Sequence, residues 1–256
     1  MPGKTTRPST SKRALKAPSS DGDHRDIRNQ ILLALPRNEY QVVVPQLEFV
    51  RLKPRHLLHE AGDTLKSAYF CNTGMISILS VLSDGKCVEV GLVGKEGLVG
   101  LPLVAGFRAA STRAIVQIEA TAFRVSADAL TEMLRTCPVL ERRLQQASQI
   151  SAMEVTQIAA CNRLHEVEKR LTRWLLMCAD RIDSNSLPLT QELLGQMLGT
   201  RRSSVTVAAG VLAKDGLISS ARGYVTIKDR QRLKQVSCEC YELMQNQIKL
   251  WRDDRA

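Results

Sequence analysis

The segment that most constrains the fold lies near the C-terminus and has the pattern of two short helices joined by a tight turn. Thr190 can cap the first helix, and Glu192 follows in its first turn. Gly195 lets a second helix cross closely, Gly199 permits the turn, and Val205 fills the space between the helices. Further apolar positions that complete this core are Leu193, Leu194, Met197, Leu198 and Leu212. The pattern predicts a helix-turn-helix.

Two short alternating runs follow the helix pair and flank the dipeptide Arg222-Gly223. Alternation of apolar and polar residues around a turn is typical of a β-hairpin. The hairpin would place the Arg222 cation at its tip. Together with the helix pair it predicts a winged helix-turn-helix from about Leu187 to Ile227.

Polar and basic residues gather near the start of the second helix, the part of such a helix that meets base edges and phosphates in a major groove. An arginine can donate two hydrogen bonds to guanine, which is worth roughly 1–3 kcal/mol of discrimination. Hydroxyl groups suit phosphate oxygens. The residues expected to contact double-stranded DNA are Thr190, Gln191, Arg201, Arg202, Ser203, Ser204, Thr206 and Arg222.

The net charge of +10 also suits a polyanionic partner. Part of this charge is uninformative, because residues before position 29 carry seven Lys and Arg against three acids. Residues 1–24 are rich in Ser, Thr, Pro and Lys and have almost no large apolar side chains, so we expect a flexible basic tail. A short helix is expected over Ile27–Leu35, ending at Pro36.

Between His56 and Ser126 the chain consists of short apolar runs separated by glycine. Asp84-Gly85 marks a turn, and runs of this length predict the hairpins of a small antiparallel roll. The runs are Met75–Leu82, Cys87–Val93, Ala114–Ile118 and Ala122–Val125. Glycine recurs at every third position from Gly91 to Gly100, which favours turns with positive φ over close approach to a phosphate.

From Ala127 the pattern becomes helical, with mostly apolar positions that step by three and four as in a helix-packing seam. The seam consists of Ile150, Met153, Gln157, Ala160, Leu164, Val167, Leu171, Trp174 and Cys178. Its first half suits a dimer partner and its second half suits the core of the next domain. Packing of the whole seam inside one subunit is equally compatible with this periodicity.

The glycine-punctuated roll, the connecting helix and the Leu-Thr-Gln-Glu…Gly-Gln-Met-Leu-Gly-x-x-Arg-x-x-Val core of the C-terminal motif resemble the Crp–Fnr superfamily of bacterial transcription regulators. The resemblance covers roughly residues 45–230. It implies an α+β protein with a cyclic-nucleotide-binding-type antiparallel β-roll, a long dimerisation helix and a winged helix-turn-helix. The implied boundaries are 1–24 (tail), 25–135 (roll), 136–161 (dimerisation helix), 162–235 (DNA-binding domain) and 236–256 (helical extension).

The resemblance also implies a homodimer that binds a palindromic site and acts with RNA polymerase. It places Arg202 at the position of the family's guanine-reading arginine. Ser203 stands where many members have a base-contacting Glu, and Val207 where the cAMP receptor protein has a second base-reading Arg. The preferred DNA sequence should therefore differ from that of the cAMP receptor protein.

The roll departs from the cyclic-nucleotide binders of the family, which carry Gly-Glu for the ribose and Arg-Ser/Thr for the phosphate. Here Leu101 follows Gly100, and the Arg position falls near Thr112, with Arg113 one residue late and on the other face of a strand. We therefore expect a degenerate sensor with a different small-molecule effector or none; a cyclic nucleotide in a non-standard pocket is the alternative. Candidate pocket residues are Gly100, Leu101, Arg108, Ser111, Thr112 and Arg113.

Seven cysteines leave a redox- or metal-responsive regulator open as an alternative. Cys238 and Cys240 are close in sequence, but two thiolates are too few for an iron–sulfur cluster unless Cys161 or Cys178 joins them. We expect free structural thiols, with no metal and no cofactor. For haem, the candidate ligands are His59 and His165.

Other function classes fit the sequence less well. His59-Glu60 and His165-Glu166 begin like zinc-hydrolase motifs but lack the second His, and neither a GxSxG elbow nor a Walker loop is present. An aromatic content of 4% offers few stacking platforms for RNA. With no secretory leader and no apolar run of about 20 residues, the expected protein is a cytoplasmic bacterial regulator that is not an enzyme and does not enter a membrane.

Overall fold

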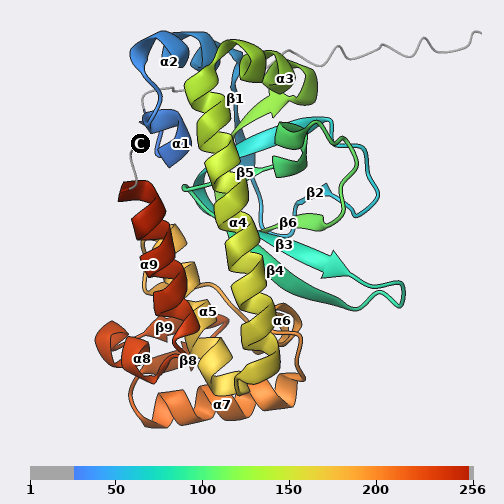
Figure 1. Ribbon diagram of the computed structural model, residues 1–256. Coiled ribbons are helices and arrows are strands. Elements are labelled where there is room, and N and C mark those ends of the chain that lie inside the picture. The colour runs from blue at the N-terminus through green and yellow to red at the C-terminus, as the bar shows by residue number, and fades with distance from the viewer. Residues whose placement is uncertain (1–25, 254–256) are drawn as a thin grey trace, which may run out of the picture.

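The computed structural model describes residues 26–253, with side chains described through residue 250. The tail predicted over residues 1–24 lies outside this part of the chain. Figure 1 shows an antiparallel roll, a long helix α4 (Pro138–Leu164) that crosses it, and a C-terminal helical domain with a small sheet. This is the α+β architecture predicted from the sequence.

Two short helices precede the roll. Helix α1 (Gln30–Leu33) is shorter than the predicted helix because the Asn29 side chain caps its N-terminus, accepting hydrogen bonds from the next turn. Helix α2 (Arg37–Val43), which was not predicted, begins directly after Pro36 and continues into the 3-10 turn η2 (Val44–Gln46). The Glu39 carboxylate of α2 accepts hydrogen bonds from two backbone amides at the start of α4, and so joins the two segments.

The roll is one antiparallel sheet with the strand order β1-β6-β3-β4, in which β2 pairs with β6 and β5 pairs with β3. Its elements are β1 (Glu48–Leu52), β2 (Leu57–His59), β3 (Ser67–Val81), β4 (Cys87–Val93), β5 (Leu98–Val99), the 3-10 helix η3 (Leu101–Ala105) and β6 (Arg113–Ser126). The predicted hairpin is confirmed, because β3 pairs with β4 around Gly85, whose φ is +82°. The two runs expected after Ala114 form the single strand β6, which follows β3 along its length through bulges.

Helix α3 (Ala127–Thr136), capped by Ser126, leads from the roll into α4. The predicted seam is divided between α4 and α5 (Val167–Ile182), since the chain leaves the helix at His165 and Glu166. The second half of the seam is buried in the C-terminal domain, as expected. Much of the first half packs inside its own subunit: Met153 lies against the core, and the Gln157 amide donates to the Cys240 sulfur.

The C-terminal domain combines a three-stranded sheet of order β7-β9-β8 with five helices among the described residues. Its elements after α5 are β7 (Ser186–Leu187), α6 (Gln191–Met197), α7 (Arg202–Lys214), β8 (Ile218–Ala221), β9 (Tyr224–Ile227), α8 (Arg230–Val236) and α9 (Cys240–Asp253). Helix α9 turns back and runs beside α4 (Figure 1).

One apolar core extends across the boundary between the roll and the C-terminal domain. Met75 and Leu79 of β3 belong to the same buried cluster as Leu171, Trp174 and other residues of the C-terminal domain. The C-terminal domain is therefore packed onto the roll. No helix in residues 26–253 is both long enough and apolar enough to cross a membrane.

Candidate nucleic-acid interface and sensor domain

Helices α6 and α7 form the predicted helix-turn-helix, and the residues singled out for its geometry have the expected contacts. The Leu193 amide donates to the Thr190 hydroxyl at 3.3 Å and caps α6. A Cβ on Gly195 would lie 3.2 Å from the Thr200 carbonyl oxygen, and Gly199 has a φ of +58°. Val205 is fully buried between the helices. These contacts confirm the tight turn and the close crossing.

The N-terminal end of α7 is open to solvent. Arg202 is the first residue of the helix, and its side chain, like that of Arg201 before it, is exposed. A guanidinium nitrogen of Arg202 lies 3.9 Å from the Glu192 carboxylate, a loose pairing of two exposed groups that stabilises little. Ser203 is exposed and Ser204 is half-buried. Arg202 is thus free to contact a partner.

Polar contacts connect this end of α7 to the start of α6 and to the wing. The Thr206 hydroxyl lies 2.8 Å from the Gln191 side-chain oxygen. Arg222 is exposed at the turn between β8 and β9, where its φ is +48°. A Cβ on neighbouring Gly223 would lie 4.0 Å from the Thr190 methyl group. The residues predicted to contact DNA therefore lie along one surface formed by α6, α7 and the wing.

Only one of the predicted effector residues lines the cavity described below. Arg108 is paired with Asp128 at 2.6 Å, and Arg113 is paired with Glu60 at 2.9 Å. A cavity of about 250 Å³ lies instead between α1, the β4–β5 connection, α4 and α9, and Leu101 is the only predicted pocket residue in its wall. Ser111 and Thr112 lie beside Arg113, outside this cavity.

A buried polar network connects the roll to α5. Glu89 of β4 accepts a hydrogen bond from the Ser77 hydroxyl at 2.6 Å and another from the Trp174 indole. Burial raises the pKa of Glu89 to about 7, although both hydrogen bonds oppose the shift. Arg181 of α5 pairs with Glu154 of α4 and with Glu96 of the β4–β5 connection, at 3.0 Å each. Sequence reasoning missed this network, because its members are distant in sequence and no local pattern connects them.

The glycines between Gly91 and Gly100 have several roles. Gly100 alone of these has a positive φ, of +105°, so the expectation of left-handed turns is wrong for the other three. Gly94 is required for a different reason, since a Cβ there would lie 2.8 Å from the Arg181 Cβ. Gly199 in the helix-turn-helix likewise lies against the roll, with Val88 2.9 Å from its would-be Cβ. Close packing between the domains explains both positions.

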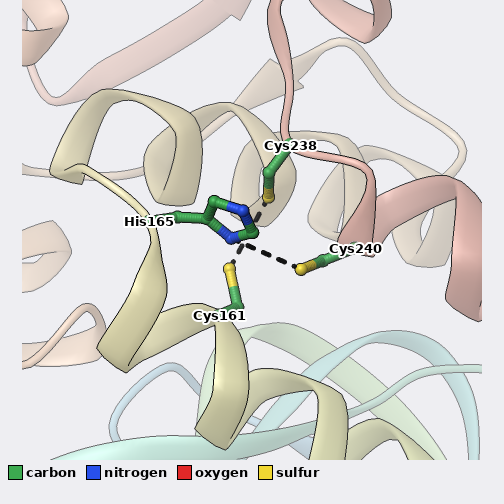
Figure 2. Close-up of side chains that lie close together, drawn as sticks. All are labelled: Cys161, His165, Cys238 and Cys240. Atoms are coloured by element: carbon green, nitrogen blue, oxygen red, sulfur yellow. Dashed lines mark hydrogen bonds between the residues drawn. The ribbon is translucent and has the colours of Figure 1, made fainter.

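Three cysteines and one histidine converge where α4 ends (Figure 2). The Sγ atoms of Cys161 and Cys238 are 3.6 Å apart, and the Cys240 Sγ lies 3.5 Å from His165 Nδ1. All four donor atoms lie within 4.8 Å of one another. Cys161 thus joins the pair Cys238 and Cys240, whereas Cys178 is buried elsewhere, near Glu89. His59, the other candidate ligand, is not part of this group.

Comparisons with known proteins agree with this architecture. Residues 169–236 match the model of the Crp-like helix-turn-helix domain, and residues 49–137 match that of the cyclic nucleotide-binding domain. FixK2 from Bradyrhizobium japonicum has a similar structure, with a TM-score of 0.65 and 16% identity over 75% of this chain and 98% of its own. No curated protein matches the chain.

Two further solved structures share the fold. The c-di-GMP responsive global regulator CLP of Xanthomonas campestris superposes with a TM-score of 0.64 at 16% identity, covering 76% of this chain and 100% of its own. A CRP-family transcriptional regulator from Thermus thermophilus gives 0.62 at 20% identity, covering 73% and 96%. Such regulators are not enzymes. With a cyclic-nucleotide-binding-type roll, a Crp-like helix-turn-helix and this shared fold, the chain belongs to the Crp–Fnr family of DNA-binding transcription regulators.

Proposed function

We propose that this regulator acts as a homodimer in the cytoplasm, binds a palindromic site through Arg202 and works with RNA polymerase there. The exposed N-terminal turn of α7 carries this proposal. Arg202 begins the helix and is exposed, while Val205, about one turn later, is fixed in the core. A helix in this arrangement can enter a major groove with its arginine toward guanine O6 and N7.

Neighbouring residues support a particular sequence preference. The hydroxyls of Ser203 and Thr206 are exposed beside Arg202 and suit phosphate or base contacts. Val207 is 69% exposed, so its side chain is open to a partner. An apolar side chain there would pack against a thymine methyl group and cannot make an arginine's contacts with guanine. The half-site should therefore contain one guanine read by Arg202, with thymine near Val207.

The second copy would pair along the exposed face of α4. Ala152, Val155 and Ala159 follow one another at helical spacing and are open to solvent in the monomer. The two alanines would let a second α4 approach closely. This face differs from the predicted seam, whose Met153 and Gln157 are used inside the subunit. Two copies related by a twofold axis would present two α7 helices to the two halves of a palindrome.

Selection of bound sequences from a pool of random duplex DNA tests the proposal directly. The purified full chain should enrich an inverted repeat whose two half-sites are about one helical turn apart. Binding should also weaken steeply with salt, because phosphate contacts release counterions. Enrichment of a single unrepeated motif, or of no motif at all, would contradict the proposed dimeric readout.

For the sensor, we propose that the roll does not bind cyclic AMP or cyclic GMP. Both candidate phosphate-binding arginines are already paired with acids, Arg108 with Asp128 and Arg113 with Glu60. Leu101 also brings no carboxylate for a ribose. Isothermal titration with cyclic AMP, cyclic GMP and c-di-GMP tests this. A submicromolar dissociation constant for either mononucleotide would show a non-standard pocket, and tight binding of c-di-GMP alone would identify a different effector.

A further inference from the structure

We propose that Cys161, His165, Cys238 and Cys240 bind one Zn²⁺ ion at the junction of α4 with the DNA-binding domain. The four residues come from two distant parts of the chain. Cys161 lies in the last turn of α4, and His165 follows that helix directly. Cys238 and Cys240 lie between α8 and α9. The fold thus brings a Cys₃His donor set to one point, as Figure 2 shows.

The spacing of the donor atoms matches a single tetrahedral ion. With Zn–S bonds of about 2.3 Å and Zn–N bonds of about 2.0–2.1 Å, tetrahedral ligands lie about 3.5–3.8 Å apart. The Cys161–Cys238 sulfur separation is 3.6 Å, and the Cys240 sulfur is 3.5 Å from His165 Nδ1. The remaining separations stay within 4.8 Å, so small side-chain rotations close the set around an ion.

The histidine is oriented as a metal ligand would be. Its Nδ1 points toward the sulfurs, whereas its Nε2 lies 3.3 Å from the Glu239 carboxylate. Zinc-binding histidines commonly donate their second ring N–H to a carboxylate, which fixes the tautomer and leaves the other nitrogen as the ligand. Buried thiols that served only for packing would not require this arrangement.

A hydrogen-bond donor and two buried cations surround the four residues. The Gln157 amide lies 3.1 Å from the Cys240 sulfur and can donate a hydrogen bond to it. Arg170 and Arg173 are buried near Cys161, and neither forms an ion pair with a carboxylate among residues 26–250. Their guanidinium Nε atoms are also buried without hydrogen-bond partners. Three thiolates, one neutral imidazole and Zn²⁺ carry a net charge of −1, which these cations would balance.

Other occupants fit less well. An iron–sulfur cluster distributes its ligands over at least two iron atoms, so some of its donor atoms must lie farther apart than those seen here. A haem needs an open face beside its histidine, whereas the His165 side chain is 17% exposed and faces three thiols. A closed site of four protein ligands is instead typical of structural zinc.

Binding of the zinc ion displaces the protons of the three thiols, and these protons pass to the buffer.

The ion would fix α9 and the winged helix-turn-helix to the end of α4. Because α4 also carries the proposed dimer face, the site lies where the spacing of the two DNA-binding domains is set. Zinc loss should release this connection and weaken operator binding. This last effect depends on the proposed function, whereas zinc binding itself does not.

Metal content of the purified full chain provides the first test. We expect one zinc per chain by elemental analysis after purification without chelator. Replacement by Co²⁺ should give the d–d bands of tetrahedral cobalt and sulfur-to-cobalt charge transfer. Absence of stoichiometric zinc, together with three accessible thiols at Cys161, Cys238 and Cys240 that give no such cobalt spectrum, would overturn the proposal. Iron with sulfide, or a Cys161–Cys238 disulfide found by mass spectrometry in place of bound metal, would also overturn it.

Variants locate the ion. Cys240→Ser should remove the stoichiometric metal, His165→Cys should retain it with a changed cobalt spectrum, and the control Cys87→Ser should leave it unaltered. Glu239→Gln should lower the zinc affinity about 10–100-fold while keeping tetrahedral coordination. If Cys240→Ser fails to fold, the His165→Cys spectrum still decides whether residue 165 is a ligand. A cobalt spectrum identical in wild type and His165→Cys would contradict this assignment.

Binding to operator DNA before and after zinc removal by chelation then tests the coupling. A fall in affinity that added zinc restores would support it. If the untreated protein contains zinc and its affinity for the operator does not change when the zinc is removed, the coupling alone is refuted. If the zinc-loaded protein shows no specific binding to DNA, the result counts against the proposed function.

Discussion

Arg202 and Glu89 represent two opposite situations for a charged side chain in this protein. Arg202 is exposed and held only by a 3.9 Å approach to Glu192, so its binding capacity is unused within the chain. Glu89 is buried, and its hydrogen bonds from Ser77 and Trp174 are satisfied within the molecule. Arg202 is therefore available for recognition and contributes little to the fold, whereas Glu89 contributes to the stability of the fold.

Arg202→Ala should weaken binding to the selected DNA site and relax the preference at one base pair. A lost bidentate contact with guanine corresponds to roughly 1–3 kcal/mol, or about a 5- to 150-fold change in dissociation constant. Fluorescence anisotropy with specific and scrambled duplexes measures the difference. Lys214→Ala, which removes a charge from the other end of α7, serves as the control. Equal losses on both duplexes would contradict base reading by Arg202.

Glu89 should make stability depend on pH in a defined direction. The carboxyl has an ordinary pKa of 4.5, and burial raises its pKa in the folded protein to about 7. The stability contributed by the protonated form is therefore fully present below about pH 4.5 and is lost as the pH rises through 7. By pH 8 the loss should reach about 3 kcal/mol.

Glu89→Gln should remove this dependence, because the amide keeps the shape of the side chain without ionising. Denaturant unfolding between pH 5 and about 8 would show a flatter stability profile for the variant. The exposed Glu119→Gln provides a matched control on the same sheet. Identical pH slopes for wild type and Glu89→Gln would show that the buried carboxyl is not the source.

At the level of elements, α4 has two faces with separate roles. The inward face, with Met153 and Gln157, packs within the subunit. The outward face carries Ala152, Val155 and Ala159. Periodicity alone could not distinguish these faces, because small and apolar residues occur on both.

Ala159→Glu should convert the proposed dimer to a monomer, since it places a charge from each copy on the shared face. Analytical ultracentrifugation over a range of concentrations measures this. Ala213→Glu makes the same change on an exposed position of α7 and should leave the dimer intact. A dimer that persists in Ala159→Glu would place the interface elsewhere.

Elements defined by local patterns could be predicted from the sequence. The capped α6, the Gly199 turn and the hairpin at Gly85 were predicted and are present. Helix α2 was missed, because Pro36 was interpreted as an end when it also begins the next helix. The Cys₃His group was not expected: Cys161 with His165, and Cys238 with Cys240, are local pairs, but only the return of α9 along α4 brings them together.

At the scale of the whole molecule, the packing of the C-terminal domain on the roll depends on Gly94. A methyl group there would lie 2.8 Å from Arg181, in a contact that leaves no room for it. Gly94→Ala should therefore lower the free energy of unfolding by roughly 1–3 kcal/mol. Gly210 of α7 has open space around it, so Gly210→Ala should instead raise stability by up to about 1 kcal/mol. Thermal or denaturant unfolding of both variants would separate close packing from a general effect of the methyl group.

The apolar core that spans the two domains has a consequence for signalling. Leu79 from the roll and Leu171 from the C-terminal half bury surface in the same cluster, so neither domain has a complete interior without the other. The chain should melt in one cooperative transition. A ligand that binds both orientations of the DNA-binding domain equally well shifts no population between them. To reorient the domain, the ligand must bind the reoriented state more tightly, by at least the free energy of this shared burial. The threshold for switching is thus set by hydrocarbon packing far from the DNA.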